Sequence, residues 1–410
     1  MWHLGADQAV SACGLLLLIW LDLARLDSVS FFAGSISPMK ISSSRRLLVF
    51  HFPLSRAART GALFLLLLVG LSAAQPCSAD DGGTLVVARI SHTATLLANG
   101  HVLLAGGRRQ SLGSVLKASE LYDPETNVWT ATGDLHQERL IHTACLLPDG
   151  RVLVAGGINH YNTWLDSAEI YNPASGHWTY TGRMNVPHAF CEMVLLPNGL
   201  VLMTGSVEGT SELYNPATRT WTVTGSMNHP RYDGRTTLLP NGKVLVAGGD
   251  FIPEAELYDP ATGLWTDTGS LVTPRRLQAQ TLMADGRVLV AGGTNYSGSY
   301  LTSAEIYDPA TGIWTQTGDM MEGRTAATAN LLPDGGVFVA GGLNVSFIGL
   351  TSIEEYDPLQ QAWHVSNLTL QYGRFSHTTT TLLDGSLIVA GGSHTGFQLV
   401  PNAELFVRPR

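Results

Sequence analysis

The sequence predicts an all-β fold built from seven copies of one four-stranded unit that close into a ring. A pair of glycines, degenerate as Gly205–Ser206 in the third copy, recurs every 43 to 50 residues along the 410-residue chain. Each interval repeats the same order of apolar segments, tight-turn sequences, a Tyr and a Trp. A fixed period near 50 residues indicates a repeat architecture. The doublets are Gly106–Gly107, Gly156–Gly157, Gly205–Ser206, Gly248–Gly249, Gly292–Gly293, Gly341–Gly342 and Gly391–Gly392.

Each unit is expected to supply four strands, which the local sequence defines in order. The first is typified by "HTATLL" and is followed by a turn such as Pro148-Asp149-Gly150, because Asp-Gly and Asn-Gly accept the positive φ angles of tight hairpins. The second, "VLVAGG", is apolar without alternation, which predicts burial on both faces. The third, "AEIYDP", ends at Pro, and the fourth begins at Trp.

Doublet, Tyr and Trp recur together in six of the seven units, from about residue 84 to the end. In this they resemble the kelch repeats of secreted bacterial β-propellers, and the propeller of galactose oxidase in particular. The resemblance implies a seven-bladed kelch β-propeller over residues 80–410. A closed ring fits the physics, because neighbouring sheets cover each other's faces and leave few open edges. The repeats are expected at about 89–138, 139–187, 188–230, 231–274, 275–323, 324–373 and 374–410.

The seventh unit ends at "AELFVRPR" without a Trp strand. A spare apolar stretch, "GTLVVAR" at 83–89, precedes the first unit. We therefore expect strand 83–89 to supply the missing outer strand of the last blade and to close the ring.

The first 79 residues lie outside the repeats and indicate targeting. An eleven-residue apolar run at 61–71 follows several arginines and precedes small residues, which predicts a secretory signal over 39–79, cleaved after Ala74 or Ala79. Residues 1–38 are interpreted as a non-native or disordered upstream extension. The protein is therefore expected to be secreted: extracellular, periplasmic or on the cell surface. An uncleaved anchor is the alternative, and only then is membrane contact expected.

The composition of the chain argues against some classes of partner and cofactor. The net charge of −9 argues against nucleic acid, whose binding needs a basic surface. The four cysteines form no CxxC or zinc-like spacing, and no catalytic motif such as GxSxG or HExxH occurs. We expect no metal, no cofactor, no assignable catalytic residue and a monomer. One alternative stays open: His92, His142 and His377 share a repeat position and could bind a metal or satisfy backbone groups.

The segments between second and third strands differ from copy to copy, whereas the strands repeat. Because loops carry function on rigid scaffolds, this long-loop face is the predicted binding surface. Trp164 and Phe347 could instead fold their loops back on the blades. The candidate ligand-binding residues on these loops are Arg108, Arg109, His160, Tyr161, Trp164, Tyr296, Tyr300, Phe347, His394 and Phe397.

A basic residue stands seventeen positions before each doublet, at the expected start of each innermost strand. Such a ring at the mouth of the central channel could hold carboxylate or phosphate groups. The alternative is structural pairing with an acidic residue of the same unit. The basic residues are Arg89, Arg139, His188, Arg231, Arg275, Arg324 and Arg374, and the acidic ones are Glu120, Glu169, Glu212, Glu256, Glu305, Glu354 and Glu404.

The sequence thus favours an exported binding module that recognises a protein or a glycan through its long-loop face. The alternative is a carbohydrate-active enzyme with its site at the channel mouth. This alternative comes from resemblance, because galactose oxidase and a bacterial sialic-acid epimerase are similar kelch propellers.

Overall fold

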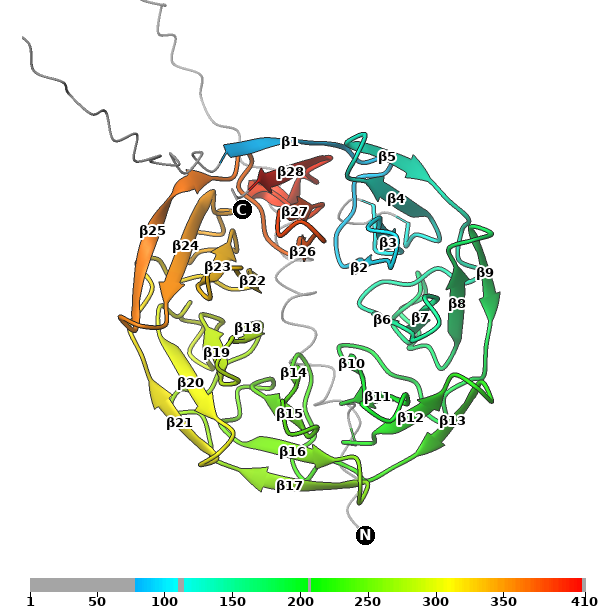
Figure 1. The fold of residues 1–410 in the computed structure, drawn as a ribbon, viewed down its shortest axis with the longest axis horizontal. Helices are drawn as coiled ribbons and strands as arrows, with labels where there is room; N and C mark the ends of the chain where they lie inside the picture. Colours follow the sequence, from blue (N-terminus) through cyan, green and yellow to red (C-terminus); the bar gives the residue numbers. More distant parts are fainter. Residues whose placement is uncertain (1–77, 110–113, 206–207, 408–410) are drawn as a thin grey trace, which may run out of the picture. The chain divides into compact units, whose positions relative to one another are not determined.

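The computed structural model describes residues 78–109, 114–205 and 208–407, which belong to one compact unit, Ala74–Arg410. These residues form seven four-stranded antiparallel sheets around a common axis (Figure 1). The prediction of an all-β, seven-bladed propeller is confirmed. The predicted upstream extension and nearly all of the signal segment lie outside the described residues. Within the described ranges, no helix is long and apolar enough to cross a membrane.

The strands of each blade follow one another outward from the axis. The innermost strands of blades 1 to 7 are β2 (Thr93–Leu96), β6 (Thr143–Leu146), β10 (Glu192–Leu195), β14 (Arg235–Leu238), β18 (Ala279–Leu282), β22 (Thr328–Leu331) and β26 (Thr378–Thr381). The second strands are β3 (Val102–Ala105), β7 (Val152–Ala155), β11 (Val201–Thr204), β15 (Val244–Ala247), β19 (Val288–Ala291), β23 (Val337–Ala340) and β27 (Leu387–Ala390). The third strands are β4 (Ser119–Asp123), β8 (Ala168–Asn172), β12 (Glu212–Asn215), β16 (Ala255–Asp259), β20 (Ala304–Asp308), β24 (Ser352–Asp357) and β28 (Asn402–Val407). The outer strands of blades 1 to 6 are β5 (Val128–Ala131), β9 (His177–Tyr180), β13 (Thr220–Val223), β17 (Leu264–Thr268), β21 (Ile313–Gln316) and β25 (Ala362–Thr369). One short 3-10 helix, η1 (Thr395–Phe397), lies in the last blade.

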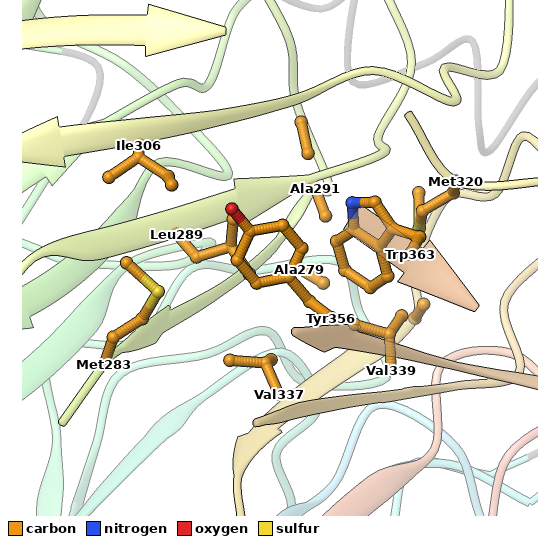
Figure 2. Packing of buried hydrophobic residues seen from close by; sticks show 12 residues of the cluster. Ala279, Met283, Leu289, Ala291, Ile306, Met320, Val337, Val339, Tyr356 and Trp363 are labelled. Carbon is orange, nitrogen blue, oxygen red and sulfur yellow. The ribbon is translucent and has the colours of Figure 1, made fainter. Parts of the chain in front are cut away.

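The core consists of seven apolar clusters, one between each pair of neighbouring blades. Between blades 5 and 6, Met283 and Leu289 pack against Tyr356 and Trp363 (Figure 2). All seven second strands are buried along their whole length, as the unbroken apolar pattern predicts, because a neighbouring blade covers each face. The ring therefore has no apolar blade face left open to water.

The recurring Tyr and Trp pack between blades, as predicted. In blades 1 to 6 the Tyr of the third strand stacks on the Trp of the fourth, with ring centroids 4.9 to 5.3 Å apart. The Tyr hydroxyl reaches the preceding blade, as in the 2.7 Å hydrogen bond between Tyr307 and Thr268. The doublets allow neighbours to approach closely. A Cβ on Gly106 would lie 2.6 Å from the carbonyl oxygen of Arg139 in the next blade.

The ring closes through an N-terminal strand, but not the one expected. The outer strand of blade 7 is β1 (Ser78–Thr84), which pairs antiparallel with β28, so the prediction of strand 83–89 is wrong in position. Residues beyond Thr84 have other contacts. Leu85 is buried in the cluster between blades 7 and 1, and the N–H groups of Val86 and Val87 donate to Glu120. The closing strand therefore begins two residues before the predicted start of the propeller at 80.

Candidate functional site on the loop face

The loops between second and third strands lie on the same face as the links between blades. In blade 2 the link residue Leu140 bridges Ile158 at the start of the loop, and Ile158 bridges Trp164 at its return. Arg276, Thr294 and Tyr300 repeat this arrangement in blade 5. We call this side the loop face.

The seven basic residues lie beneath this face and are not offered to a ligand. Each is at most 1 % exposed and pairs with the glutamate of its own blade. The prediction that Arg139, His188, Arg231, Arg275, Arg324 and Arg374 bind a ligand is therefore wrong, and the structural alternative holds. The pairs are Arg89–Glu120 (2.5 Å), Arg139–Glu169 (3.0 Å), His188–Glu212 (3.2 Å), Arg231–Glu256 (2.9 Å), Arg275–Glu305 (2.7 Å), Arg324–Glu354 (2.5 Å) and Arg374–Glu404 (2.5 Å).

Each pair works as a clamp that ties the link to the blade. In blade 5, Arg275 donates to the carbonyl oxygens of Gly292 and Ser303, while Glu305 accepts the N–H groups of Val272 and Thr273. Burial lowers the pKa of Arg275, and the charge of Glu305 opposes that shift. Buried charges are tolerated here because they are paired and hydrogen-bonded.

A second set of repeated positions comes two residues after each clamp residue, just before the innermost strand of each blade. All seven adopt φ between 52° and 58°, the left-handed region that non-glycine residues rarely enter. Backbone hydrogen bonds run between them from blade to blade, as from the N–H of Asp233 to the carbonyl oxygen of Phe190 (3.1 Å). We call them the axial ring. Its members are Ser91, Ile141, Phe190, Asp233, Leu277, Ala326 and Ser376.

At the axial-ring positions, at the positions just before them and on the innermost strands, charged residues occur only in blades 3 to 5. Asp233 is the one charged member of the axial ring, and Arg276 is the one charged residue at the position just before it in each repeat. Glu192 and Arg235, the first residues of β10 and β14, are the only charged residues on the seven innermost strands. They form an ion pair across neighbouring blades (2.8 Å), and Glu192 also accepts the N–H of Thr236 (2.6 Å).

Asp233 and Arg276 have unusual surroundings. Burial raises the pKa of Asp233 to about 6, although Arg276 and Arg235 oppose the shift. Burial also raises the pKa of Asp250, which accepts the N–H of Tyr232 (2.8 Å). A carboxyl with a strongly shifted pKa beside a named charge partner marks a candidate functional position.

Arg276 is 8 % exposed, with its guanidinium carbon 4.4 Å from the centre of the Phe251 ring. Its side chain forms no hydrogen bond and no ion pair with any residue that the structure describes, and its Nε is buried without a partner. Buried polar groups are normally satisfied, so this guanidinium calls for an explanation.

Aromatic rings flank the charges on both sides. Trp164 packs against Tyr232 (5.6 Å) and Phe190 (6.1 Å), so it reaches over blades 3 and 4 rather than folding onto its own blade. This is possible because the loops of blades 3 and 4 are the shortest on the face. On the other side, Tyr296 lies edge-on to Phe251 at 6.0 Å.

Four predicted residues therefore belong to one region. Tyr296 is 89 % exposed, and Phe347 is 45 % exposed and contacts Tyr300 at 6.4 Å. Tyr300 is half-buried, and burial raises its pKa, while the Arg276 charge opposes that shift. Arg276 stacks on Phe251, and Phe251 contacts Tyr296, while Trp164 contacts Tyr232 of the neighbouring link. We call the group formed by Trp164, Phe190, Glu192, Tyr232, Asp233, Arg235, Asp250, Phe251, Arg276, Tyr296, Tyr300 and Phe347 the blade 3–5 cluster.

The other predicted loop residues make contacts close to their own loops. His160 stacks on Tyr161 (3.6 Å) and contacts Glu138, and Tyr161 is 77 % exposed. His394 hydrogen-bonds the carbonyl oxygen of Gly373 (2.8 Å), and Phe397 lies edge-on to Phe375. Arg109 is exposed, and burial lowers the pKa of the half-buried Arg108.

The three repeat-position histidines serve packing between blades. His92, His142 and His377 each hydrogen-bond, through Nε2, a threonine hydroxyl of the preceding blade at 3.1 Å. Each ring lies against the first glycine of that blade's doublet. Across the described ranges, no group of three or more His, Cys, Asp or Glu side chains could hold a metal ion.

The sequence analysis missed the other eight members of the cluster: Phe190, Glu192, Tyr232, Asp233, Arg235, Asp250, Phe251 and Arg276. The repeat pattern draws attention to residues that recur in every copy, whereas these residues occur in only one or two copies. Aligning the seven repeats and asking where charge and aromatic rings appear in only one or two copies would have found them.

Comparisons with known proteins support the fold. The Kelch motif model matches residues 141–185 and 275–321, which fall in blades 2 and 5. A search of the curated proteins found no match. One similar solved structure is a fungal alcohol oxidase of the AA5 family, in complex with copper: 18% identical, TM-score 0.67, covering 81% of this chain and 76% of the other.

This likeness identifies the fold alone. The match is 18% identical, and 1315 solved chains match in all, so it singles out no activity. The copper belongs to the fungal oxidase, and a likeness at this identity does not transfer it to this chain. The chain is a seven-bladed β-propeller with kelch motifs, similar in structure to the propeller of an AA5-family oxidase.

Proposed function

We propose that this protein is an exported binding module that recognises a protein or a glycan through its loop face, with the blade 3–5 cluster as the contact region. The observation that carries the proposal is the concentration of aromatic and charged side chains at the positions where the repeats diverge. Exposed aromatic residues, an uncommitted arginine and a few acidic groups are the composition of recognition sites.

Exposure supports this choice of residues. Tyr296 and Phe347 place large apolar surfaces in water, and the inter-blade clusters do not include them. Aromatic side chains contribute much contact area at a low entropic cost, so they dominate binding energies when a partner covers them.

The test is a screen of protein and glycan arrays with the purified protein, followed by affinity measurements on variants. Tyr296→Ala and Phe347→Ala should weaken binding of the ligand found by tenfold or more. The matched control is Leu359→Ala, which removes an exposed apolar side chain (94 %) from the turn between β24 and β25, away from the loop face. Equal binding by all three variants would contradict the proposal.

A second candidate, sugar-directed catalysis, is favoured by one observation. A carboxyl with a pKa of about 6 can both accept and donate a proton near neutral pH, and Asp233 has that pKa beside Arg276. Incubation with a sugar panel, followed by NMR, would detect isomerisation or oxidation. Turnover that Asp233→Asn abolishes without loss of binding would support catalysis over binding alone.

A further inference from the structure

We propose that Asp233 and Arg276 form the polar anchor of a site for a neutral saccharide ring, with the aromatic side chains on either side as its apolar walls. This inference rests on the proposed function and deepens it by naming the ligand class.

The Arg276 guanidinium is a hydrogen-bond donor without an acceptor among the described residues. Every clamp arginine donates to a glutamate and to at least two backbone carbonyl oxygens, as Arg374 does to Glu404 and to the carbonyl oxygens of Tyr372, Gly391 and Asn402. Arg276 is also buried, although less completely at 8 % exposure, yet its side chain has no such partner in the described part of the chain. Stacking on Phe251 fixes the plane of the guanidinium, so its donors point in set directions.

The Asp233 carboxylate is the hydrogen-bond acceptor of the proposed site. The backbone of Asp233 is held at φ 56° by its place in the axial ring, and its N–H is used by Phe190. Its carboxylate accepts no hydrogen bond from any described residue. Asp233 follows Tyr232, whose N–H donates to Asp250, and Arg276 stacks on Phe251, the residue after Asp250. The Arg276 charge lowers the pKa of Asp233, against the effect of burial, but the two side chains form no ion pair in the described residues. Donor and acceptor are therefore neighbours that do not satisfy each other.

This donor and this acceptor match the hydroxyl groups of a sugar. A hydroxyl group both donates and accepts, so adjacent hydroxyls on one ring can donate to Asp233 and accept from Arg276. The C–H face of the same ring is apolar and packs on an aromatic plane. Trp164 packs on Tyr232, which precedes Asp233 in the chain, and Tyr296 packs on Phe251, on which Arg276 stacks.

The charge of the cluster selects a neutral sugar. Glu192 and Arg235 neutralise each other in their ion pair. The remaining charged side chains of the cluster are Asp233 and Asp250, which are negative, and Arg276, which is positive. Together they leave an excess of one negative charge at neutral pH. An anionic sugar or a phosphate would meet this excess in a half-buried site, where like charges are weakly screened.

The experiment measures binding of the methyl glycosides of glucose, galactose and mannose, and of their β-linked disaccharides, by NMR titration of the purified protein. Glucuronic acid and an acidic peptide are the comparison probes. Asp233→Asn and Arg276→Lys are each expected to weaken the best neutral saccharide tenfold or more, since lysine lacks the planar donor fork. The control is Asp285→Asn, in the exposed turn of the same blade as Arg276 on the opposite face. Equal unfolding temperatures show that the variants fold.

Several results would overturn the inference: no neutral saccharide binds, glucuronic acid or the peptide binds better, or neither variant changes the affinity. The proposed function is judged separately. If Tyr296→Ala weakens binding of a ligand found on the arrays but no saccharide binds, the proposed binding function is supported and the saccharide site is wrong. If saccharide binding is weakened by Asp233→Asn but no ligand is affected by Tyr296→Ala or Phe347→Ala, the contact role proposed for Tyr296 and Phe347 is wrong and the saccharide site is supported.

Discussion

Blades 7, 1 and 2 share one clamp design with blades 3 to 5 but use the surroundings of the axis differently. In the first group the residue three positions after the clamp is His377, His92 or His142, and each ring is packed against a neighbouring doublet. In the second group Cys191, Gly234 and Gln278 hold that position, and Glu192, Asp233, Arg235 and Arg276 gather nearby. The comparison indicates that the clamps hold the link to the blade in both groups, so that the residues beside them can differ: packed histidines in blades 7, 1 and 2, and charged residues in blades 3 to 5.

The largest expected effect comes from the closure itself. Deleting Ser78–Thr84 removes the outer strand of blade 7 and the 2.9 Å hydrogen bond from Trp129 Nε1 to the carbonyl oxygen of Gly82. The melting temperature should fall sharply, because the edge of β28 and the cluster between blades 7 and 1 become exposed. Calorimetry provides the measurement, and a chain that begins at Ser78 is the control. An unchanged melting temperature would show that the ring does not need this strand.

The clamps should be equally important in both groups of blades. Glu404→Ala in blade 7 and Glu305→Ala in blade 5 each leave a buried arginine unpaired, which should cost about 3–5 kcal/mol of unfolding free energy. Asp285→Ala breaks the exposed pair with Arg287 and should cost less than about 1 kcal/mol. Urea unfolding measures all three. If one of the two glutamate variants lost much less unfolding free energy than the other, the clamp would not stabilise both groups of blades equally.

Acid should act mainly on blades 7, 1 and 2. Burial, with a smaller contribution from the charge of Arg374, lowers the pKa of His377 from 6.5 to about 3. The unfolded chain therefore takes up this proton first, and stability is lost as the pH falls from about 6.5 toward 3. His377→Gln, which copies Gln278 of blade 5, should move the acid-unfolding midpoint to lower pH by circular dichroism. His101→Gln, at a more exposed histidine, should leave it in place.

The smallest expected effect is at the blade 3–5 cluster. Burial raises the pKa of Asp233 above its ordinary 3.8 to about 6, with Arg276 and Arg235 opposing and Asp250 and Glu192 adding to the rise. Its contribution to stability is therefore full below pH 3.8 and lost as the pH rises to about 6. Asp233→Asn should be slightly more stable than the parent above pH 6 and equal to it below pH 3.8. Melting temperatures across this range test the sign, and an opposite trend would remove the evidence that the carboxyl is desolvated.

The basic ring shows where a repeated pattern can mislead. Seven basic residues at one position suggest a binding ring as readily as a structural one, because spacing fixes the position along the strand but not the direction of the side chain. In the structure Arg275 points into the blade, where Glu305 and three carbonyl oxygens accept its hydrogen bonds. The closing strand was misplaced for a similar reason. The sequence favours the apolar 83–89, but Leu85 is needed in the core, and the polar segment 78–84 pairs with β28 instead.

The sequence by itself determined the number of blades, the order of strands, the fully buried second strands and the Tyr–Trp packing, because each of these depends on short-range pattern and on a period that every copy repeats. Only the tertiary structure decided that Arg276 of blade 5 stacks on Phe251 of blade 4, and that Trp164 of blade 2 packs on Tyr232 of blade 4. Residues from separate copies meet only when the blades pack side by side, and a repeat pattern read along one chain does not show which side chains that packing brings into contact.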